Sequence, residues 1–392
     1  MIPALTRLLG RLPIGWLQLS HNPGRLLAAV AGVAFANVLV FVQLGLSGSL
    51  EETVLRPYRM FDSDLLLVSA VDSDGLEDGS NLPRVRLYQA LSHPQITDGA
   101  PLYVGRVAWL TEGGDSSALG LYALPTHHRD FFRHDLTAKL EPVSMLDTAL
   151  TDRKTRFLDM TPFENATPEL PVLFEIQGRR IRSVGTFSLG GGFGGDGGLL
   201  VSEQTFFRLV PNRTSAAPSH LLLRVAHGAN RQEVAAGVAA LIGAGNAKVV
   251  PIEEAMGTAA KVQLQDRPTG IIFTFGVVIG VIVGIVIAYQ VLATDVADHL
   301  KEYATFKAMG YPHRFFVSII LEEALVLGAI GFVPGILLAK IFYDGLVRSA
   351  NVPVFMTTER AVLVFVGTLV ACSVSGMLAI RRLHAADPAE LF

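Results

Sequence analysis

The segment GIIFTFGVVIGVIVGIVIAYQVL, residues 270–292, carries no charged side chain over a length that crosses the hydrocarbon core of a bilayer. A core helix of a soluble protein usually stays apolar for only ~10–14 residues. Three more apolar runs lie elsewhere in the sequence, at residues 26–46, 315–342 and 361–380. The sequence therefore predicts four transmembrane helices.

The composition points to the same class of protein. Half of the residues (50%) are hydrophobic and 17% are charged. The formal net charge of −3 gives no basic surplus for binding phosphates, which excludes nucleic acid as a main partner. The single cysteine, Cys372, excludes an internal disulfide and a zinc site built from cysteines.

Lysine and arginine gather in three of the segments that flank the apolar runs, and such residues mark the cytoplasmic side of a membrane protein. They are Arg7, Arg11 and Arg25 before the first run, Lys301, Lys307 and Arg314 between the second and third, and Arg381 and Arg382 after the fourth. We therefore expect residues 1–25, 294–310 and 381–392 to be cytoplasmic. Residues 47–269 and the short loop 343–360 then face the opposite side.

The N-terminal region is expected to remain attached to the chain as a membrane anchor. Its apolar run, residues 26–46, is longer than the hydrophobic region of a signal peptide. The preceding residues 1–25 place leucines at helical spacing among arginines, which predicts an amphipathic segment on the inner leaflet.

The long connection between the first two apolar runs, residues 47–269, is large enough to fold around its own core. Short apolar runs typical of strands alternate there with helical patterns. We expect residues 50–95 and 200–265 to form a membrane-proximal part, with 96–199 as an inserted subdomain. The predicted fold is thus an α-helical membrane protein with four transmembrane helices and a large mixed α+β extracytoplasmic domain between the first and second.

The sequence lacks the common motifs of catalysis. GxxxxGK[ST], HExxH and GxSxG are all absent, so we expect no enzyme activity, no bound cofactor and no metal site in this chain. The cluster GGGFGGDGG, residues 190–198, lacks the lysine of a phosphate-binding loop, and we interpret it as a flexible hairpin tip or lid. His127, His128 and His134 are interpreted as solvated loop residues.

The cytoplasmic segment TDVADHLKEYATFKAM, residues 294–309, is polar and amphipathic, with Leu300, Tyr303 and Phe306 on one helical face. Asp295 can cap its start, and Gly310 supplies a C-terminal stop. This pattern predicts a helix over 294–310 that docks into a groove of a cytoplasmic partner. The alternative is a surface helix that lies among lipid headgroups.

Two further features lie inside the apolar runs. Glu322 and Glu323 fall in the first turns of the third helix, close to the inner leaflet, where a structural or coupling role is favoured over a proton relay. Small residues at four-residue spacing allow close helix packing, with a dimer seam as one interpretation. These residues are Gly280, Gly284, Gly331 and Gly335.

The segment DVADHLKEYATFKAMGYPHRFFVSIILEEALVLGAIGFVPG, residues 295–335, resembles the FtsX/MacB-type permease subunits of ABC transporters. Together with APLYVG at 100–105 and RRLHAADPAELF at 381–392, it is especially similar to the DevC branch, the membrane subunit of the DevBCA exporter. MacB differs from this sequence, because its corresponding segment is richer in arginine and its ATPase is fused to its N-terminus. A separate ATPase subunit is therefore expected here.

The resemblance implies a homodimer in the bacterial inner membrane, seated on a cytoplasmic ATPase dimer that binds ATP and magnesium. It also implies a periplasmic domain that meets a membrane-fusion adaptor and an outer-membrane duct, with export of a lipid, glycolipid or other amphiphile by mechanotransmission. The positions that it assigns to coupling with the ATPase are Asp295, Leu300, Glu302, Tyr303, Phe306, Lys307 and Gly310.

Two other functions remain open at this point. An FtsX-like regulatory scaffold would use the same mechanotransmission to activate a periplasmic cell-wall hydrolase. A membrane-bound enzyme would use His127, His128 and glutamates of the outward domain. A neighbouring adaptor gene would favour export, and a neighbouring hydrolase gene would favour regulation.

Overall fold

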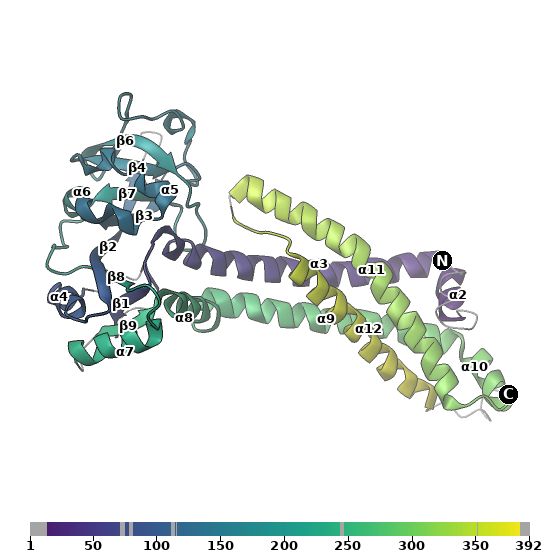
Figure 1. The fold of residues 1–392 in the computed structure, drawn as a ribbon. Helices are drawn as coiled ribbons and strands as arrows, with labels where there is room; N and C mark the ends of the chain where they lie inside the picture. The colour runs from purple at the N-terminus through teal and green to yellow at the C-terminus, as the bar shows by residue number, and fades with distance from the viewer. Residues whose placement is uncertain are drawn as a thin grey trace. The chain divides into compact units, whose positions relative to one another are not determined.

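The computed structural model describes residues 14–70, 75–77, 81–110, 114, 116–243, 247–350 and 352–384. The chain forms two compact units. A helical unit comprises residues 1–47, 272–346 and 354–392, and a sheet domain comprises 48–271 and 347–353 (Figure 1). The expected amphipathic segment before residue 14 and the tail after 384 lie outside the described residues.

Four helices among the described residues are long and apolar enough to cross a membrane, which confirms the four predicted spans. They are α3 (Pro23–Leu55), α9 (Pro268–Asp298), α11 (His313–Ala350) and α12 (Thr358–His384). Two short helices, α2 (Ile14–His21) and α10 (Leu300–Ala308), complete the helical unit. All four long helices extend beyond the apolar runs, because the flanking polar residues continue the backbone hydrogen bonding of the helix.

Glycines let α9 and α11 approach α3 closely. A Cβ atom at Gly280 would lie 2.9 Å from Cγ2 of Val40, and one at Gly331 would lie 2.7 Å from Cγ1 of Val33. Their partners at four-residue spacing, Gly284 and Gly335, also face α3. The structure thus uses all four predicted packing glycines inside one chain, against the same helix.

Nine strands of the sheet domain form one mixed sheet within the described residues, in the order β5-β6-β4-β7-β3-β2-β8-β1-β9. The strands are β1 (Leu65–Ser69), β2 (Ile96–Leu110), β3 (Ser116–Leu124), β4 (Thr148–Asp152), β5 (Val172–Ile176), β6 (Arg179–Phe187), β7 (Gly197–Ser202), β8 (His220–Val225) and β9 (Ala247–Pro251). The long β2 pairs with β8 through its first half and with β3 through its second half. The pairs β3–β7 and β4–β6 are parallel and the others antiparallel.

Helices cover the sheet and confirm the mixed α+β prediction. They are α4 (Val85–Leu91), α5 (His134–Thr137), α6 (Glu203–Leu209), α7 (Arg231–Ile242) and α8 (Ile252–Gln265), with 3-10 turns η1 (Tyr58–Met60), η2 (Thr126–Phe131), η3 (Pro142–Ser144) and η4 (Thr161–Phe163). Along β1, Leu65 and Leu67 pack in the core beside α7, whereas Leu66 packs in the core on the opposite face. Both faces are buried, which explains why the first four residues of this strand, 65–68, are apolar.

The glycine cluster at residues 190–198 is packed, and its interpretation as a flexible tip is wrong. The buried carboxylate of Asp152 accepts hydrogen bonds from the backbone N–H of Leu189 at 3.0 Å and of Gly190 at 2.6 Å. Nη1 of Arg156 donates to the carbonyl oxygen of Gly192 at 2.8 Å. A Cβ atom at Gly192 would lie 2.0 Å from Oγ1 of Thr53. The glycines are therefore needed where this loop approaches neighbouring side chains closely, because a Cβ atom would clash there.

His220 is fully buried at the start of β8. Its Nε2–H donates to the carbonyl oxygen of Leu76 at 2.9 Å, and its Nδ1 has no hydrogen-bond partner among the described residues. Burial lowers the pKa of His220 from 6.5 to about 4, against the opposing effect of the bond to Leu76. The imidazole is therefore neutral in the folded domain at neutral pH.

The sheet domain is expected to lose stability as pH falls from 6.5 towards 4. Over this range His220 is protonated in the unfolded chain, whereas its lowered pKa keeps it neutral in the folded chain. His220 accounts for about 3 kcal/mol of this loss by linkage. Unfolding of the full chain in detergent, measured at pH 7 and pH 4.5, should show a weaker pH dependence in His220→Gln than in the wild type. An equal dependence in the two proteins would contradict the assignment.

Candidate functional site

The candidate site surrounds α10, the short helix between the two central spans. The sequence predicts one helix over 294–310, whereas in the structure residues 294–298 complete α9 and α10 begins at Leu300. His299 separates the two helices, and its backbone angles are φ −93° and ψ 11°. Gly310, at φ +89°, terminates the turn after α10, as its sequence position suggests.

One face of α10 packs inside the helical unit. Tyr303 is 1% exposed, its ring lies edge-on to Phe316 with a centroid distance of 5.8 Å, and its hydroxyl donates to Oε1 of Gln18 at 3.1 Å. Burial raises the pKa of this hydroxyl, so it remains a donor across the physiological range. Phe306 contacts Tyr311 and Phe315 in the same way. Tyr303 and Phe306 therefore anchor α10 to α2 and α11.

Exposed side chains flank this buried face of α10, and two of them are charged. Glu302, Lys307 and Gly310 are all exposed, so these three predicted coupling positions are accessible to a partner. Sequence reasoning missed two apolar neighbours, Met309 at 60% exposed and Tyr311 at 44%. The available signal was their position on either side of Gly310, the glycine that ends the turn after α10.

An ion-pair cluster ties the first span to the second next to α10. The guanidinium of Arg25 on α3 pairs with the carboxylate of Asp298 and lies 3.7 Å from that of Asp295. Asp295 is 4% exposed, and Nδ1 of His299 lies 3.5 Å from its Oδ2. Asp295 is thus an internal residue that links helices, while Leu300 is half-buried at the start of α10. No local sequence pattern indicates the pairing with Arg25, which is distant along the chain.

Both predicted carboxylates of α11 are buried. Oε1 of Glu322 accepts a hydrogen bond from the backbone N–H of Trp16 at 3.5 Å. Gly15 brings α2 so close to α11 that an added Cβ would lie 2.8 Å from the carbonyl oxygen of Ile319. Neither carboxylate oxygen of Glu323 has a hydrogen-bond partner among the described residues.

Glu323 lines a polar cavity of about 190 Å³ between α2, α3, α9 and α11. Its other lining residues are Gln18, Leu19, His21, Asn22, Arg25, Leu26, Ala29, Val291, Asp295, Asp298 and His299. No group of three histidine, cysteine or acidic side chains in the described part of the chain is arranged to hold a metal ion.

Polar contacts join several helices at this end of the helical unit. Tyr303 joins α10 to α2, Glu322 joins α2 to α11, and Arg25 joins α3 to α9.

Comparison with known proteins finds a family model that matches part of the helical unit. Residues 273–388 match the family model described as FtsX-like permease C-terminal. None of the curated proteins matches the sequence.

Two solved structures are similar to part of the chain. The periplasmic region of MacB from Actinobacillus actinomycetemcomitans is 12% identical, with a TM-score of 0.34, and the match covers 51% of this chain and 94% of that one. The extracellular domain of the ABC-type transporter YknZ from Gram-positive bacteria is 9% identical, with a TM-score of 0.33, and the match covers 47% of this chain and 98% of that one. The family match runs from α9 through α12 and includes α10, so this part of the chain is an FtsX-like permease C-terminal region.

Proposed function

We propose that this chain is the permease of a DevC-like exporter that works by mechanotransmission. The observation that carries the proposal is the packing of α10, which is anchored by the buried Tyr303 and presents Glu302 and Lys307 as exposed side chains beside it. A helix built in this way can be displaced by a partner that contacts its exposed side chains, and its buried side chains can transmit the displacement. The push would come from a separate ATPase dimer, which alone binds ATP and magnesium.

The proposed orientation follows the distribution of lysine and arginine. It places α10 and both termini in the cytoplasm of a bacterial inner-membrane protein and the sheet domain in the periplasm. Two copies of the chain would act together, since ATPase domains of this kind work as dimers. The sheet domain would then pass its movement to a periplasmic adaptor and an outer-membrane duct.

The proposed cargo is a lipid, a glycolipid or another amphiphile. In this mechanism the cargo enters from the membrane or the periplasm, and the sheet domains expel it without passage between the spans. The chain itself would perform no catalysis, because its sequence lacks a phosphate-binding loop of the GxxxxGK[ST] type.

Reversing the charge of Glu302 tests the proposal. Glu302→Arg should lower the stimulation of the copurifying ATPase by about tenfold, the equivalent of ~1.4 kcal/mol, because an attraction across the contact becomes a repulsion. Membrane insertion should be unchanged. The measurement is ATP hydrolysis by the reconstituted complex.

Glu254→Arg provides the matched control, since Glu254 is an exposed glutamate on α8 of the sheet domain. It should leave ATP hydrolysis unaffected. Equal stimulation by wild type and Glu302→Arg would remove the coupling role assigned to α10.

A further inference from the structure

Two buried carboxyl groups lie against each other between α9 and α11. Glu323 of α11 is 0% exposed and Asp295 of α9 is 4% exposed. Both carboxyl oxygens of Glu323 and Oδ2 of Asp295 have no hydrogen-bond partner among the described residues. The two side chains are within hydrogen-bonding reach of each other. Three buried acceptor atoms therefore meet at one place without a donor, which native proteins rarely allow.

The donors close to this pair are already engaged. The guanidinium of Arg25 pairs with Asp298 and lies 3.7 Å from Oδ1 of Asp295. Nδ1 of His299 lies 3.1 Å from the backbone oxygen of Asp295 and 3.5 Å from its Oδ2, so it bonds the backbone oxygen. The hydroxyl of Tyr303 donates to α2. An ionised carboxylate buried without a donor is strongly disfavoured, and such a group takes up a proton instead.

The polar cavity of about 190 Å³ beside the pair has room for water. Water in it can reach Arg25 and Asp298, whose side chains are 34% and 52% exposed. The titratable and charged groups that face the pair come from every helix packed around it. They are His21 on α2, Arg25 on α3, Asp298 on α9, His299 between α9 and α10, Glu302 and Tyr303 on α10, and Glu322 on α11.

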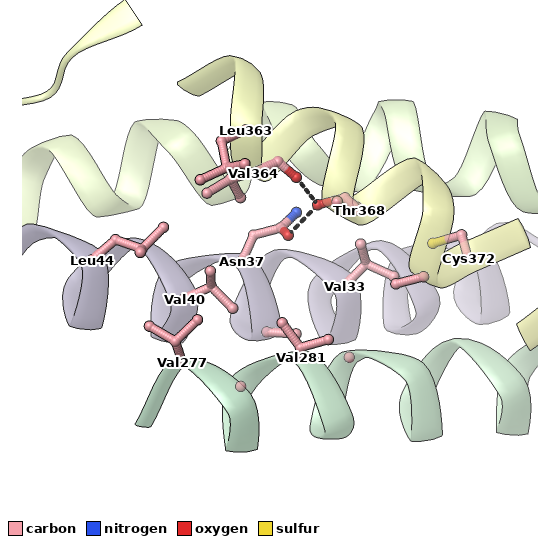
Figure 2. Close-up of a pocket in the computed structure, with 15 residues that line it drawn as sticks. Val33, Asn37, Val40, Leu44, Val277, Val281, Leu363, Val364, Thr368 and Cys372 are labelled. Atoms are coloured by element: carbon pink, nitrogen blue, oxygen red, sulfur yellow. Dashed lines mark hydrogen bonds between the residues drawn. The ribbon is translucent and has the colours of Figure 1, made fainter. Parts of the chain in front are cut away.

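This cavity differs from the apolar groove of about 280 Å³ between α3, α9 and α12, shown in Figure 2. None of the described residues that line the groove is acidic or basic. Its polar pair is neutral, with the hydroxyl of Thr368 2.6 Å from Oδ1 of Asn37. Of these two cavities, only the one beside α10 contains acidic and basic side chains.

We propose that Glu323 and Asp295 bind one proton between them at neutral pH, and that this proton holds α11 against α9 at the start of α10. Water cannot supply the missing donor, because Glu323 has no exposed surface. A proton on Glu323 turns one of its oxygens into a donor, and Oδ2 of Asp295 accepts the bond. Without the proton, two buried negative charges would repel each other.

The proposal concerns contacts within one chain and needs neither an ATPase nor an adaptor, so it stands apart from the function proposed above. Infrared spectroscopy tests it, since the C=O stretch of a protonated carboxyl group is separate from the stretches of a carboxylate. The full chain is reconstituted in phosphatidylcholine vesicles at pH 7. The difference spectrum of wild type minus Glu323→Gln should contain the band of one protonated carboxyl group.

Glu302→Gln is the matched control, because Glu302 is an exposed glutamate on the neighbouring α10. Its difference spectrum should contain carboxylate bands only. Carboxylate bands alone in the Glu323→Gln difference would overturn the proposal. So would a wild-type spectrum without any protonated carboxyl band at pH 7, and this outcome can be read even if Glu323→Gln fails to fold.

The effect of the proton on stability is tested through the pH dependence of unfolding. Unfolding exposes Glu323 to water, where a glutamate ionises above about pH 4.3, so the shared proton is released. The stability that the proton contributes is present at low pH and is lost as pH rises. The unfolding equilibrium constant of the wild type, divided by that of Glu323→Gln, should rise about tenfold per pH unit between pH 5.5 and pH 7.

Cys372 provides the readout, because it is the single cysteine of the sequence and is 2% exposed. Its Sγ would lie 3.3 Å from a Cβ atom at Gly328, so it packs against α11. Pulse labelling of this thiol in dodecyl sulfate measures the unfolded fraction of the helical unit, and comparison at equal pH cancels the titration of the thiol itself. The same ratio for Glu302→Gln should not change with pH. A constant ratio for Glu323→Gln as well would show that no proton is held between α9 and α11.

Discussion

Adding a single methyl group at Gly192 is expected to destabilise the sheet domain by about 3 kcal/mol, at the upper end of overpacking effects. The Cβ atom of Gly192→Ala would lie 2.0 Å from Oγ1 and 2.5 Å from Cγ2 of Thr53. The backbone cannot move away easily, because Gly192 N–H donates to the carbonyl oxygen of Gly195 at 2.8 Å and its own carbonyl oxygen accepts from Arg156. Thermal unfolding of the full chain in detergent measures the loss.

Gly194→Ala is the control in the same loop. Its Cβ would meet Oε2 of Glu77 at 3.5 Å, which is an ordinary contact, so stability should change little. Thr53→Ala removes the nearest clashing atom and should restore part of the stability lost in Gly192→Ala. Equal stability of the two alanine variants would show that the loop can move aside, as the composition of residues 190–198 first suggested.

Removing the ring of Tyr303 is expected to have the largest effect on coupling. Tyr303→Ala leaves a cavity beside Phe316, and such truncations cost about 3–5 kcal/mol of packing energy. With its anchor gone, α10 can shift without moving α2 and α11. Stimulation of the copurifying ATPase should therefore fall more than about tenfold, since ~1.4 kcal/mol of lost coupling already gives that factor.

Tyr303→Phe separates the ring from the hydroxyl. It keeps the contact with Phe316 and loses only the hydrogen bond to Gln18, which is worth ~1 kcal/mol. Its ATPase stimulation should fall by a few-fold at most. If Tyr303→Ala stimulates the ATPase as well as the wild type, α10 does not transmit force through its buried face.

The sequence predicts the parts of the fold that depend on local pattern. The spans follow from long apolar runs, and strands such as β1 follow from short ones, because burial in lipid or in a core imposes these patterns directly. The apolar face of α10 was also predictable, since Tyr303 and Phe306 lie three residues apart on one side of a helix. Its docking into a partner was expected, whereas in the structure Tyr303 packs against α2 and α11 of the same chain.

Contacts between distant residues could not be predicted in this way. The composition of the glycine cluster indicates flexibility, and only its packing against Thr53 and Arg156 shows the opposite. The pairing of Arg25 with Asp298 joins residues from separate helices, so no local spacing reveals it. Likewise, the helical pattern over 294–310 does not show that His299 divides it between α9 and α10.

The uninterrupted course of α3 from Pro23 to Leu55 limits how this protein can change in evolution. Within the helical unit, Val33 meets Gly331 of α11, and a later stretch of the same helix brings Val40 to Gly280 of α9. Each inserted residue turns the later stretch by about 100° and advances it by ~1.5 Å. Homologues that lengthen or shorten this helix should therefore do so by seven residues, close to two full turns, and rarely by one or two.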